Sequence, residues 1–306
     1  MTDAMPAGDA GSAAGLDRPL SAPFDPHPRK PKVAVPAGAC DCHAHVFGPG
    51  DSYPFIPHGL YTPADALPGD FLGLLDGLGL ARGVLVQPSI YAQDNQAMLD
   101  ALAPNLDRLR GIAVLPFDVG AAEVERLHGL GIRGVRCNIV DLRFDKGVLP
   151  LDGLKALAAT IRPFGWHVEF LMHVNEFPDL DRQLADFPTE VCFGHLGYVK
   201  TEHGADTDGF RAMLRLLRDG KAWVKLTAPY RLTLSAMPYQ DVDETAGLLV
   251  EAAPDRLLWG SDWPHTYIKT AMPNDGDLFD LFVDWVPDPD LRRRILVDNP
   301  ERLYGF

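Results

Sequence analysis

The stretch Val191-Cys192-Phe193-Gly194-His195-Leu196-Gly197 is a short apolar run that leads into a histidine. A second stretch, Leu257-Leu258-Trp259-Gly260-Ser261-Asp262-Trp263-Pro264-His265, has the same form and leads into an aspartate. Near-continuous apolar runs are typical of strands that are covered on both faces, as in parallel sheets. These two stretches therefore predict buried parallel strands with polar side chains at their carboxyl ends.

Eight such runs alternate with segments of helical periodicity along the chain. The predicted strands are Ala39–Val46, Gly83–Gln87, Gly111–Leu115, Gly134–Val140, His167–Val174, Glu190–His195, Ala222–Thr227 and Arg256–Ser261. The predicted helices include Asp70–Leu78, Ala121–Leu130, Leu151–Ile161, Gly209–Leu217, Asp243–Ala252 and a last helix at Asp290–Val297. This alternation predicts an α/β fold, a distorted single-domain (β/α)8 TIM barrel. A doubly wound open sheet is disfavoured because no Gly-x-Gly-x-x-Gly motif follows the first strand.

The N-terminal residues 1–36 are rich in Ala, Gly and Pro and contain few large apolar side chains. Such a segment cannot bury enough surface to offset the entropy lost on ordering. We expect an extended or disordered arm over residues 1–36 and the barrel over residues 37–306. A mobile tail is the favoured interpretation, and an arm that packs on the barrel or on a neighbouring subunit is the alternative.

The chain has 306 residues, of which 46% are apolar, and its formal net charge is −14. This charge argues against nucleic acid or an anionic membrane surface as a partner. No apolar run has transmembrane length, and the N-terminus lacks the features of a secretory signal. The cysteines form no CxxC pair, so we expect reduced core residues and a cytoplasmic location. They are Cys40, Cys42, Cys137 and Cys192.

The first predicted strand carries two histidines in Asp41-Cys42-His43-Ala44-His45. Side chains alternate along a strand, so His43 and His45 should share one face, with Cys42 and Ala44 on the other. A metal ion or a bound carbonyl would explain two adjacent imidazoles inside a barrel, and a structural pair is the alternative. Together with His195 and Asp262, they would meet at the carboxyl ends of the strands, where barrel active sites lie.

His173 ends the fifth predicted strand and shares its parity with Glu169 and His167. If these odd positions face inward, His173 can join the other site residues around one divalent ion, Zn²⁺ or Mn²⁺, with an open position for water. His167 lies at the other end of the strand and is expected to be structural. The candidate metal ligands are thus His43, His45, His173 and Asp262, and catalysis without a metal is the alternative.

Arginines form a second layer of candidates. Arg136 and Asn138 share a face of the fourth predicted strand, and Arg231 follows the seventh. An inward arginine is costly without an anionic partner, which a substrate carboxylate or a neighbouring acid would supply. Further candidates are Gln87 at the end of the second strand, Tyr53 in the long connection Gly48–Gly69, and Lys225 as a pocket residue or buried ion-pair partner. The connection Pro229–Asp241 is a second candidate substrate loop.

As a set, these residues resemble the amidohydrolase superfamily, in the branch of 2-pyrone-4,6-dicarboxylate lactonase and related sugar-acid and muconolactone lactonases. The resemblance covers about residues 39 to 306. It rests on Cys42-His43-Ala44-His45-Val46-Phe47-Gly48-Pro49, Gly134-Val135-Arg136-Cys137-Asn138, Gly194-His195-Leu196-Gly197, Gly260-Ser261-Asp262-Trp263-Pro264-His265 and Asn299-Pro300-Glu301-Arg302-Leu303-Tyr304.

The resemblance implies a hydrolase that opens a carboxylated lactone in aromatic or sugar-acid catabolism. Asp262 would be the general base, and His43, His45 and His195 would polarise the lactone carbonyl directly or through a metal. Arg136 and Arg231 would bind substrate carboxylates, with Asn138, Gln87, Tyr198, His265 and Tyr53 as further substrate-binding candidates. The branch contains metal-dependent members, whereas the pyrone lactonase works without a metal.

Two positions depart from the pyrone lactonase pattern. Tyr198 stands where that pattern has an arginine, and Arg143 only approximates its second basic residue after strand 4. A substrate with fewer or differently spaced anionic groups is therefore expected.

Two other functions compete with lactone hydrolysis. A metal-dependent decarboxylase of an aromatic or muconate-like acid would use the same set of residues and would release carbon dioxide. A non-catalytic barrel would bind a ligand without turnover. In each case the expected partner is a small anionic lactone or carboxylic acid, and the sequence leaves homo-oligomerisation open.

Overall fold

The structure is a computed structural model, and it describes residues 18–140 and 148–306. Its centre is one parallel sheet in which eight strands pair in sequence order, β1 to β8. The strands are β1 Cys40–Ala44, β2 Arg82–Val86, β3 Leu109–Ala113, β4 Ile132–Asn138, β5 His167–Leu171, β6 Val191–Phe193, β7 Ala222–Leu226 and β8 Leu257–Trp259. Asp262 N donates to His43 O (2.8 Å) and His45 N to Trp263 O (2.8 Å), so the segment after β8 closes the sheet against β1. The predicted (β/α)8 barrel is confirmed.

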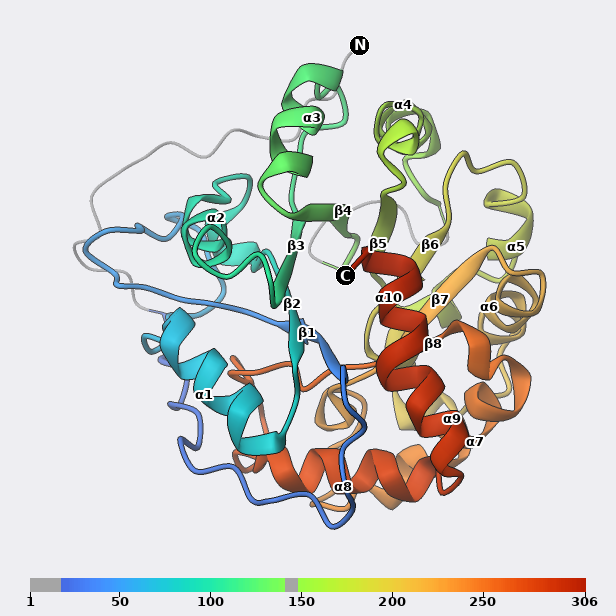
Figure 1. Ribbon diagram of the computed structural model, residues 1–306. Coiled ribbons are helices and arrows are strands. Elements are labelled where there is room, and N and C mark those ends of the chain that lie inside the picture. The colour runs from blue at the N-terminus through green and yellow to red at the C-terminus, as the bar shows by residue number, and fades with distance from the viewer. Residues whose placement is uncertain (1–17, 141–147) are drawn as a thin grey trace.

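Helices surround the strands (Figure 1). They are α1 Pro68–Leu78, α2 Gln96–Leu102, α3 Ala121–Gly129, α4 Leu151–Ile161, α5 Leu180–Gln183, α6 Asp208–Arg218, α7 Asp243–Ala252, α8 Asp275–Trp285, α9 Pro289–Arg293 and α10 Asn299–Tyr304. The bounds of α4 and α7 agree with the prediction from the sequence. No helix in residues 18–140 and 148–306 is long and apolar enough to cross a membrane.

The C-terminal helical region is longer than predicted. We expected one helix at Asp290–Val297, but a π-helical turn at Arg294–Asp298 joins α9 to α10, and the chain stays helical to Tyr304. Pro300 does not end the helix because it lies in the first turn of α10, where its missing N–H leaves no bond unmade.

All eight strands end one to three residues earlier than predicted, and after β6 and β8 the site residues lie in the loops that follow. β6 stops at Phe193 and β8 at Trp259, although the sequence favoured strands through His195 and Ser261. The reason is the backbone: φ is 51° at His195 and 65° at Asp262. A left-handed residue turns the chain away from strand geometry, so sheet pairing ends before it.

A cluster of buried side chains fills the inside of the barrel, because its members come from six different strands of the closed sheet. Leu303 and Tyr304 of α10 close it at one end. The strand members are Cys40, Cys42, Val84, Val86, Ile112, Cys192, Trp223 and Leu258. The expectation that Cys42 faces outward with Ala44 is therefore wrong. The register of β1 against β2 shifts between Asp41 and Ala44, and this bulge breaks the alternation on which the expectation rested.

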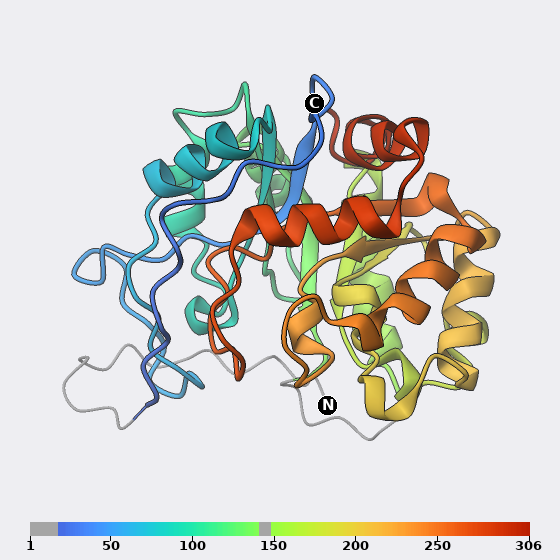
Figure 2. The same cartoon turned by 90° about the horizontal axis from the view of Figure 1, so that it is seen from below.

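The described part of the N-terminal arm, residues 18–36, is not a free tail. Arg29 forms an ion pair with Asp277 of α8 (2.8 Å), and the Phe24 ring packs on Trp263 at 4.8 Å between centroids. The arm, dark blue, runs past α8 in both views (Figures 1 and 2). Residues 1–17 and Arg143 lie outside the described residues, and the division into an arm (1–36) and a barrel (37–306) stays a prediction.

Candidate active site

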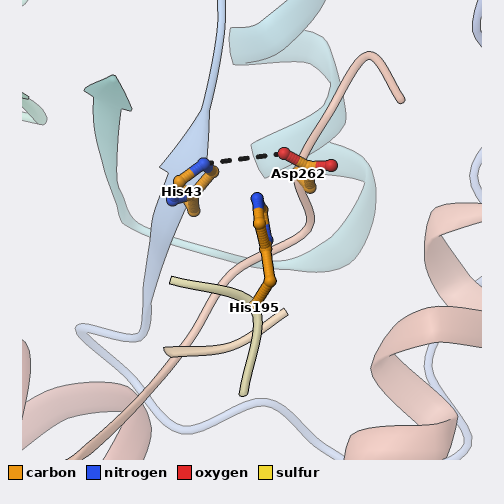
Figure 3. Close-up of side chains that lie close together, drawn as sticks. All are labelled: His43, His195 and Asp262. Atoms are coloured by element: carbon orange, nitrogen blue, oxygen red, sulfur yellow. Dashed lines mark ion pairs between the residues drawn. The ribbon is translucent and has the colours of Figure 1, made fainter. Parts of the chain in front are cut away.

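His43, His195 and Asp262 point toward one another at the carboxyl ends of the strands (Figure 3). Their nitrogen and oxygen atoms all lie within 4.8 Å of one another. His43 Nε2 is 3.5 Å from Asp262 Oδ1, and His45 Nε2 is 3.4 Å from the same oxygen. All four side chains are buried. The structure thus brings together the four residues that the sequence nominated for catalysis.

The local backbone explains why these side chains converge. Gly260 brings the chain after β8 so close to β1 that a Cβ at this position would lie 2.7 Å from His43 N. The buried carboxylate of Asp41 ties the two segments together by accepting hydrogen bonds from His43 N (3.0 Å) and from Ser261 N (3.0 Å) and Oγ (2.5 Å). Burial raises the pKa of Asp41 to about 7. The left-handed backbone of His195 and Asp262 costs roughly 1–2 kcal/mol per residue, which these contacts help to offset.

The two oxygens of Asp262 have different environments. Oδ2 accepts hydrogen bonds from Tyr230 Oη (2.7 Å) and Arg231 Nε (2.7 Å). Oδ1 has no hydrogen-bond donor among the described residues. Burial acts to raise the pKa of Asp262, but the charge of Arg231 and the nearby His195 outweigh it and hold the pKa well below its ordinary range. Asp262 is therefore a carboxylate with one anchored oxygen and one available oxygen.

The hydrogen bonds of His45 fix where its proton lies. His45 Nδ1 is 2.6 Å from Val86 O, a carbonyl that can only accept, so Nδ1 carries the proton. The lone pair of Nε2 then faces Asp262 Oδ1, which is also an acceptor. Burial lowers the pKa of His45, so a second proton on the ring is disfavoured. Two acceptors that face each other in a buried site are stabilised by a bridging donor such as water or by a metal cation.

His43 repeats this arrangement. Its Nδ1 is 3.3 Å from the Glu169 carboxylate, and its Nε2 has no hydrogen-bond partner among the described residues. Burial, with help from the charge of Lys225, lowers the pKa of His43 to about 3, so the ring is neutral. Buried neutral imidazoles and a carboxylate form a donor set that suits Zn²⁺. The residues present therefore fit one divalent ion held by His43, His195 and Asp262, with His45 Nε2 3.4 Å from Asp262 Oδ1 as a further candidate ligand.

Lys225 and Glu169 support His43 from inside the barrel. Lys225 Nζ lies 2.5 Å from Glu169 Oε2, and both side chains are almost fully buried. Burial acts to raise the pKa of Glu169, but Lys225 and His43 together outweigh it and hold the pKa well below its ordinary range. Glu169 is thus a buried anion that can hold the Nδ1 proton of His43, the usual task of a carboxylate behind a metal-binding histidine.

The space in front of Asp262 is a cavity of about 190 Å³. Arg136 lines it and donates one hydrogen bond, from Nη1 to Gln87 O (2.9 Å). Arg136 is buried, and within the described chain it forms no ion pair. Arg231 also lines the cavity, but its charge is matched by Asp262. Other lining residues are His45, Leu60, Tyr61, Ser89, His195, Tyr198, Thr266 and Tyr267.

The two arginines have different roles in the structure. For Arg231, the alternative of a salt bridge to a neighbouring acid holds, because Asp262 is that acid. For Arg136, the structure shows a buried side chain with no acidic partner among the described residues, and its role in substrate binding stays a prediction.

His173, His265 and Tyr53 do not line this cavity, and each has a partner elsewhere. His173 Nδ1 is 2.8 Å from Tyr198 O and its ring stacks on Tyr198, so it is not part of the metal-binding group found in the described residues. His265 is fully buried behind the site, between Tyr230 (2.8 Å) and Asp275 (3.0 Å). Tyr53 donates to Asp100 (2.7 Å) on the surface. Strand parity and loop position alone could not predict the directions in which these three side chains point.

Gln87 and Asn138 line a neighbouring cavity rather than this one. Gln87 Nε2 donates to Asp94 O (2.6 Å), and Asn138 Nδ2 donates to Ser89 Oγ (2.9 Å). Sequence reasoning missed Tyr230, which anchors Asp262, and Tyr61, which lines the cavity. Tyr230 lies directly before Arg231 in the predicted substrate loop, and that position was the available signal.

A family model of amidohydrolases matches residues 40–306 of this chain. The chain belongs to the amidohydrolase family. The resemblance predicted from the motifs is confirmed, and so is the expectation of a hydrolase of this superfamily. The matched region contains the whole barrel and every residue of the candidate site.

Several amidohydrolases resemble the chain over nearly its full length. A 2-pyrone-4,6-dicarboxylate hydrolase from Comamonas testosteroni is 39% identical over 91% of this chain and 93% of its own. A 4-sulfomuconolactone hydrolase from Rhizobium radiobacter is 37% identical over 89% and 91%. The structure of a probable 2-pyrone-4,6-dicarboxylic acid hydrolase from Acinetobacter baumannii, with citric acid bound, matches with a TM-score of 0.79 at 31% identity. It covers 88% of this chain and 100% of that one.

Proposed function

We propose that this amidohydrolase hydrolyses the ring ester of a lactone that carries a carboxylate, with Asp262 as the general base. The observation that carries the proposal is the asymmetry of Asp262, whose Oδ2 is held by two donors while Oδ1 faces the imidazoles without a donor. The relatives that act on pyrone dicarboxylate and sulfomuconolactone support a lactone as the substrate class.

Arg136 supplies the anchor for the substrate. It is a buried cation without an acidic partner in the described chain, and it lines the same cavity as Asp262 and His195. A carboxylate bound by its guanidinium would fix the lactone relative to the base, and such positioning contributes much of the rate enhancement in enzymes.

The reaction then proceeds in two proton transfers. Asp262 Oδ1 takes a proton from a water molecule, whose oxygen attacks the lactone carbonyl carbon. The ring C–O bond breaks, and protonated Asp262 gives the proton to the leaving alkoxide or enolate oxygen. One water is consumed and one hydroxy acid, or its keto form, is released. The pKa of Asp262 lies well below neutrality, so the base is ionised before each cycle.

A divalent ion held by His43, His45, His195 and Asp262 would supply Lewis-acid polarisation of the lactone carbonyl. The proton on His45 Nδ1 favours this version, because neutral His45 has no hydrogen at Nε2 to donate to an oxyanion. The metal-free alternative leaves carbonyl activation to His195, or requires a second proton on a histidine whose pKa burial lowers.

The Asp262→Asn substitution tests the base. It keeps the size of the side chain but removes the proton acceptor, so turnover of a carboxylated lactone should fall about 10²–10⁴-fold. Turnover should be measured by release of the hydroxy acid, with 2-pyrone-4,6-dicarboxylate and muconolactone as first substrates. Asp206→Asn is the matched control, because this side chain is 95% exposed. A folded Asp262→Asn protein with near wild-type turnover would remove Asp262 from this role.

A further inference from the structure

A second cavity, of about 370 Å³, adjoins the catalytic cavity. It lies at the carboxyl ends of β2 to β4 and under the loop that contains residues 56–61. Both cavities are lined by Leu60, Tyr61, Ser89 and Arg136, so a ligand that sits on Arg136 can reach into either of them. We call the second cavity the side cavity.

The wall of the side cavity is mostly apolar. Its apolar lining residues include Ile56, Leu60, Ile90, Val114, Phe117 and Cys137. The amide nitrogens of its wall have protein partners, since Gln87 Nε2 donates to Asp94 O and Asn138 Nδ2 donates to Ser89 Oγ, whereas the buried Gln87 Oε1 has none among the described residues. Leu60 is 55% exposed, although it stands at the junction of both cavities. An apolar wall with an exposed leucine at its mouth favours a hydrocarbon occupant over water.

One buried cation stands at the junction. Arg136 is 7% exposed and lacks an acidic partner in the described chain. It is the one arginine or lysine among the described residues that line the side cavity. A ligand that satisfies both features has a carboxylate at one end and an apolar arm beside it.

We propose that the side cavity is a binding subsite for the apolar arm of a carboxylate ligand anchored on Arg136. The inference deepens the proposed function, because it assigns to the substrate a hydrocarbon substituent next to its carboxylate. The volume is in the range of pockets that hold small organic ligands, so an arm of several carbons or one ring fits. Tyr198, Arg231 and Asp262 do not line this cavity, so the arm is directed away from the base.

The test measures binding alone and so does not depend on turnover. The probes are the straight-chain acids acetate, butanoate, hexanoate and octanoate, titrated by calorimetry against the wild-type protein. Each methylene that enters the side cavity should tighten binding about fourfold until the cavity is full. The Arg136→Met variant should bind every acid more weakly than the wild type does. Equal affinity for all four acids would overturn the subsite.

Val114→Phe fills the side cavity from its wall, whereas Val114→Ala enlarges it. In Val114→Phe, affinity should stop rising at a shorter acid than in the wild type, while acetate binds with wild-type affinity. In Val114→Ala, affinity should keep rising up to longer acids. If the phenylalanine variant does not fold, Leu60→Ser at the exposed mouth serves instead and should reduce the gain per methylene. Unchanged chain-length profiles in these variants would place the arm elsewhere.

The outcome is separable from that of the proposed function. If affinity rises with chain length but no lactone is hydrolysed, the subsite is supported and the lactonase function is contradicted. If lactones are hydrolysed but affinity does not rise with chain length, the lactonase function is supported and the subsite is contradicted.

Discussion

At the scale of single residues, the site depends on charges that the barrel buries in matched pairs. Asp262 is matched by Arg231, and Glu169 by Lys225. A buried pair adds little net stability, because both ions lose hydration, but removal of one partner leaves an isolated charge. Arg136 has no matching acid in the described chain, and this is why we assign it to the ligand.

The Lys225→Met substitution should expose this dependence. It leaves Glu169 ionised and buried without its cation, so the free energy of unfolding should fall by roughly 3–5 kcal/mol. The double variant Lys225→Met/Glu169→Leu should recover much of the loss. Urea denaturation followed by circular dichroism measures both. Equal losses in the single and double variants would show that the pair is not the source of the effect.

Asp41 should give the protein a specific pH dependence. Its pKa is raised from 3.8 to about 7 in the folded state, so the protonated carboxyl favours folding and the stabilisation is lost as the pH rises through 7. Between pH 5 and pH 8, the wild type should lose about 3 kcal/mol of unfolding free energy relative to Asp41→Asn. Denaturation curves of both proteins at the two pH values measure this difference. Parallel curves would mean that Asp41 is ionised throughout.

At the scale of elements, the approach of β8 to β1 positions the base. The Gly260→Ala substitution would put a methyl group 2.7 Å from His43 N and Cβ, so the two segments must separate and Asp262 must move. A displacement of this kind should cost turnover of the lactone about 10²-fold, more than the loss of stability explains. Gly247→Ala in α7 is the control, because its methyl group would meet nothing within 4 Å. It should raise stability by about 0.5–1 kcal/mol and leave turnover unchanged. Equal activity of the two variants would contradict the role of Gly260.

The sequence predicted the elements well where local patterns decide them. The periodicity of α4 and α7 gave both ends of each helix, and the apolar runs gave all eight strands. It placed the carboxyl end of every strand one to three residues too late. At β6 and β8 the reason is the left-handed backbone of His195 and Asp262, which depends on tertiary contacts. The bulge in β1, which turned Cys42 inward, left no signature in the local pattern either.

The candidate site was predictable in its centre and less so at its edge. Strand-end position was enough to nominate His43, His45, His195 and Asp262, since parallel strands of a barrel end on one face. Loop side chains were not predictable in this way, because their direction depends on partners distant in sequence. Tyr53 turns to Asp100 and His265 to Asp275 for this reason.

At the scale of the whole molecule, one barrel face carries a buried base, an unmatched arginine and two joined cavities, in a chain whose net charge is −14. The charge inside the cavity differs from the overall charge, because Arg136 has no acidic partner among the described residues whereas Asp262 matches Arg231. The face can therefore attract a small carboxylate although the protein as a whole repels anions.

In the proposed reaction, water attacks the carbonyl carbon of a lactone at this face. The most direct test is to incubate the protein with 2-pyrone-4,6-dicarboxylate and with muconolactone in ¹⁸O-labelled water and to analyse the products by mass spectrometry. We expect one ¹⁸O atom in the newly formed carboxylate of a ring-opened product and no release of carbon dioxide. Release of carbon dioxide, or tight binding of both lactones without any ring opening, would contradict it.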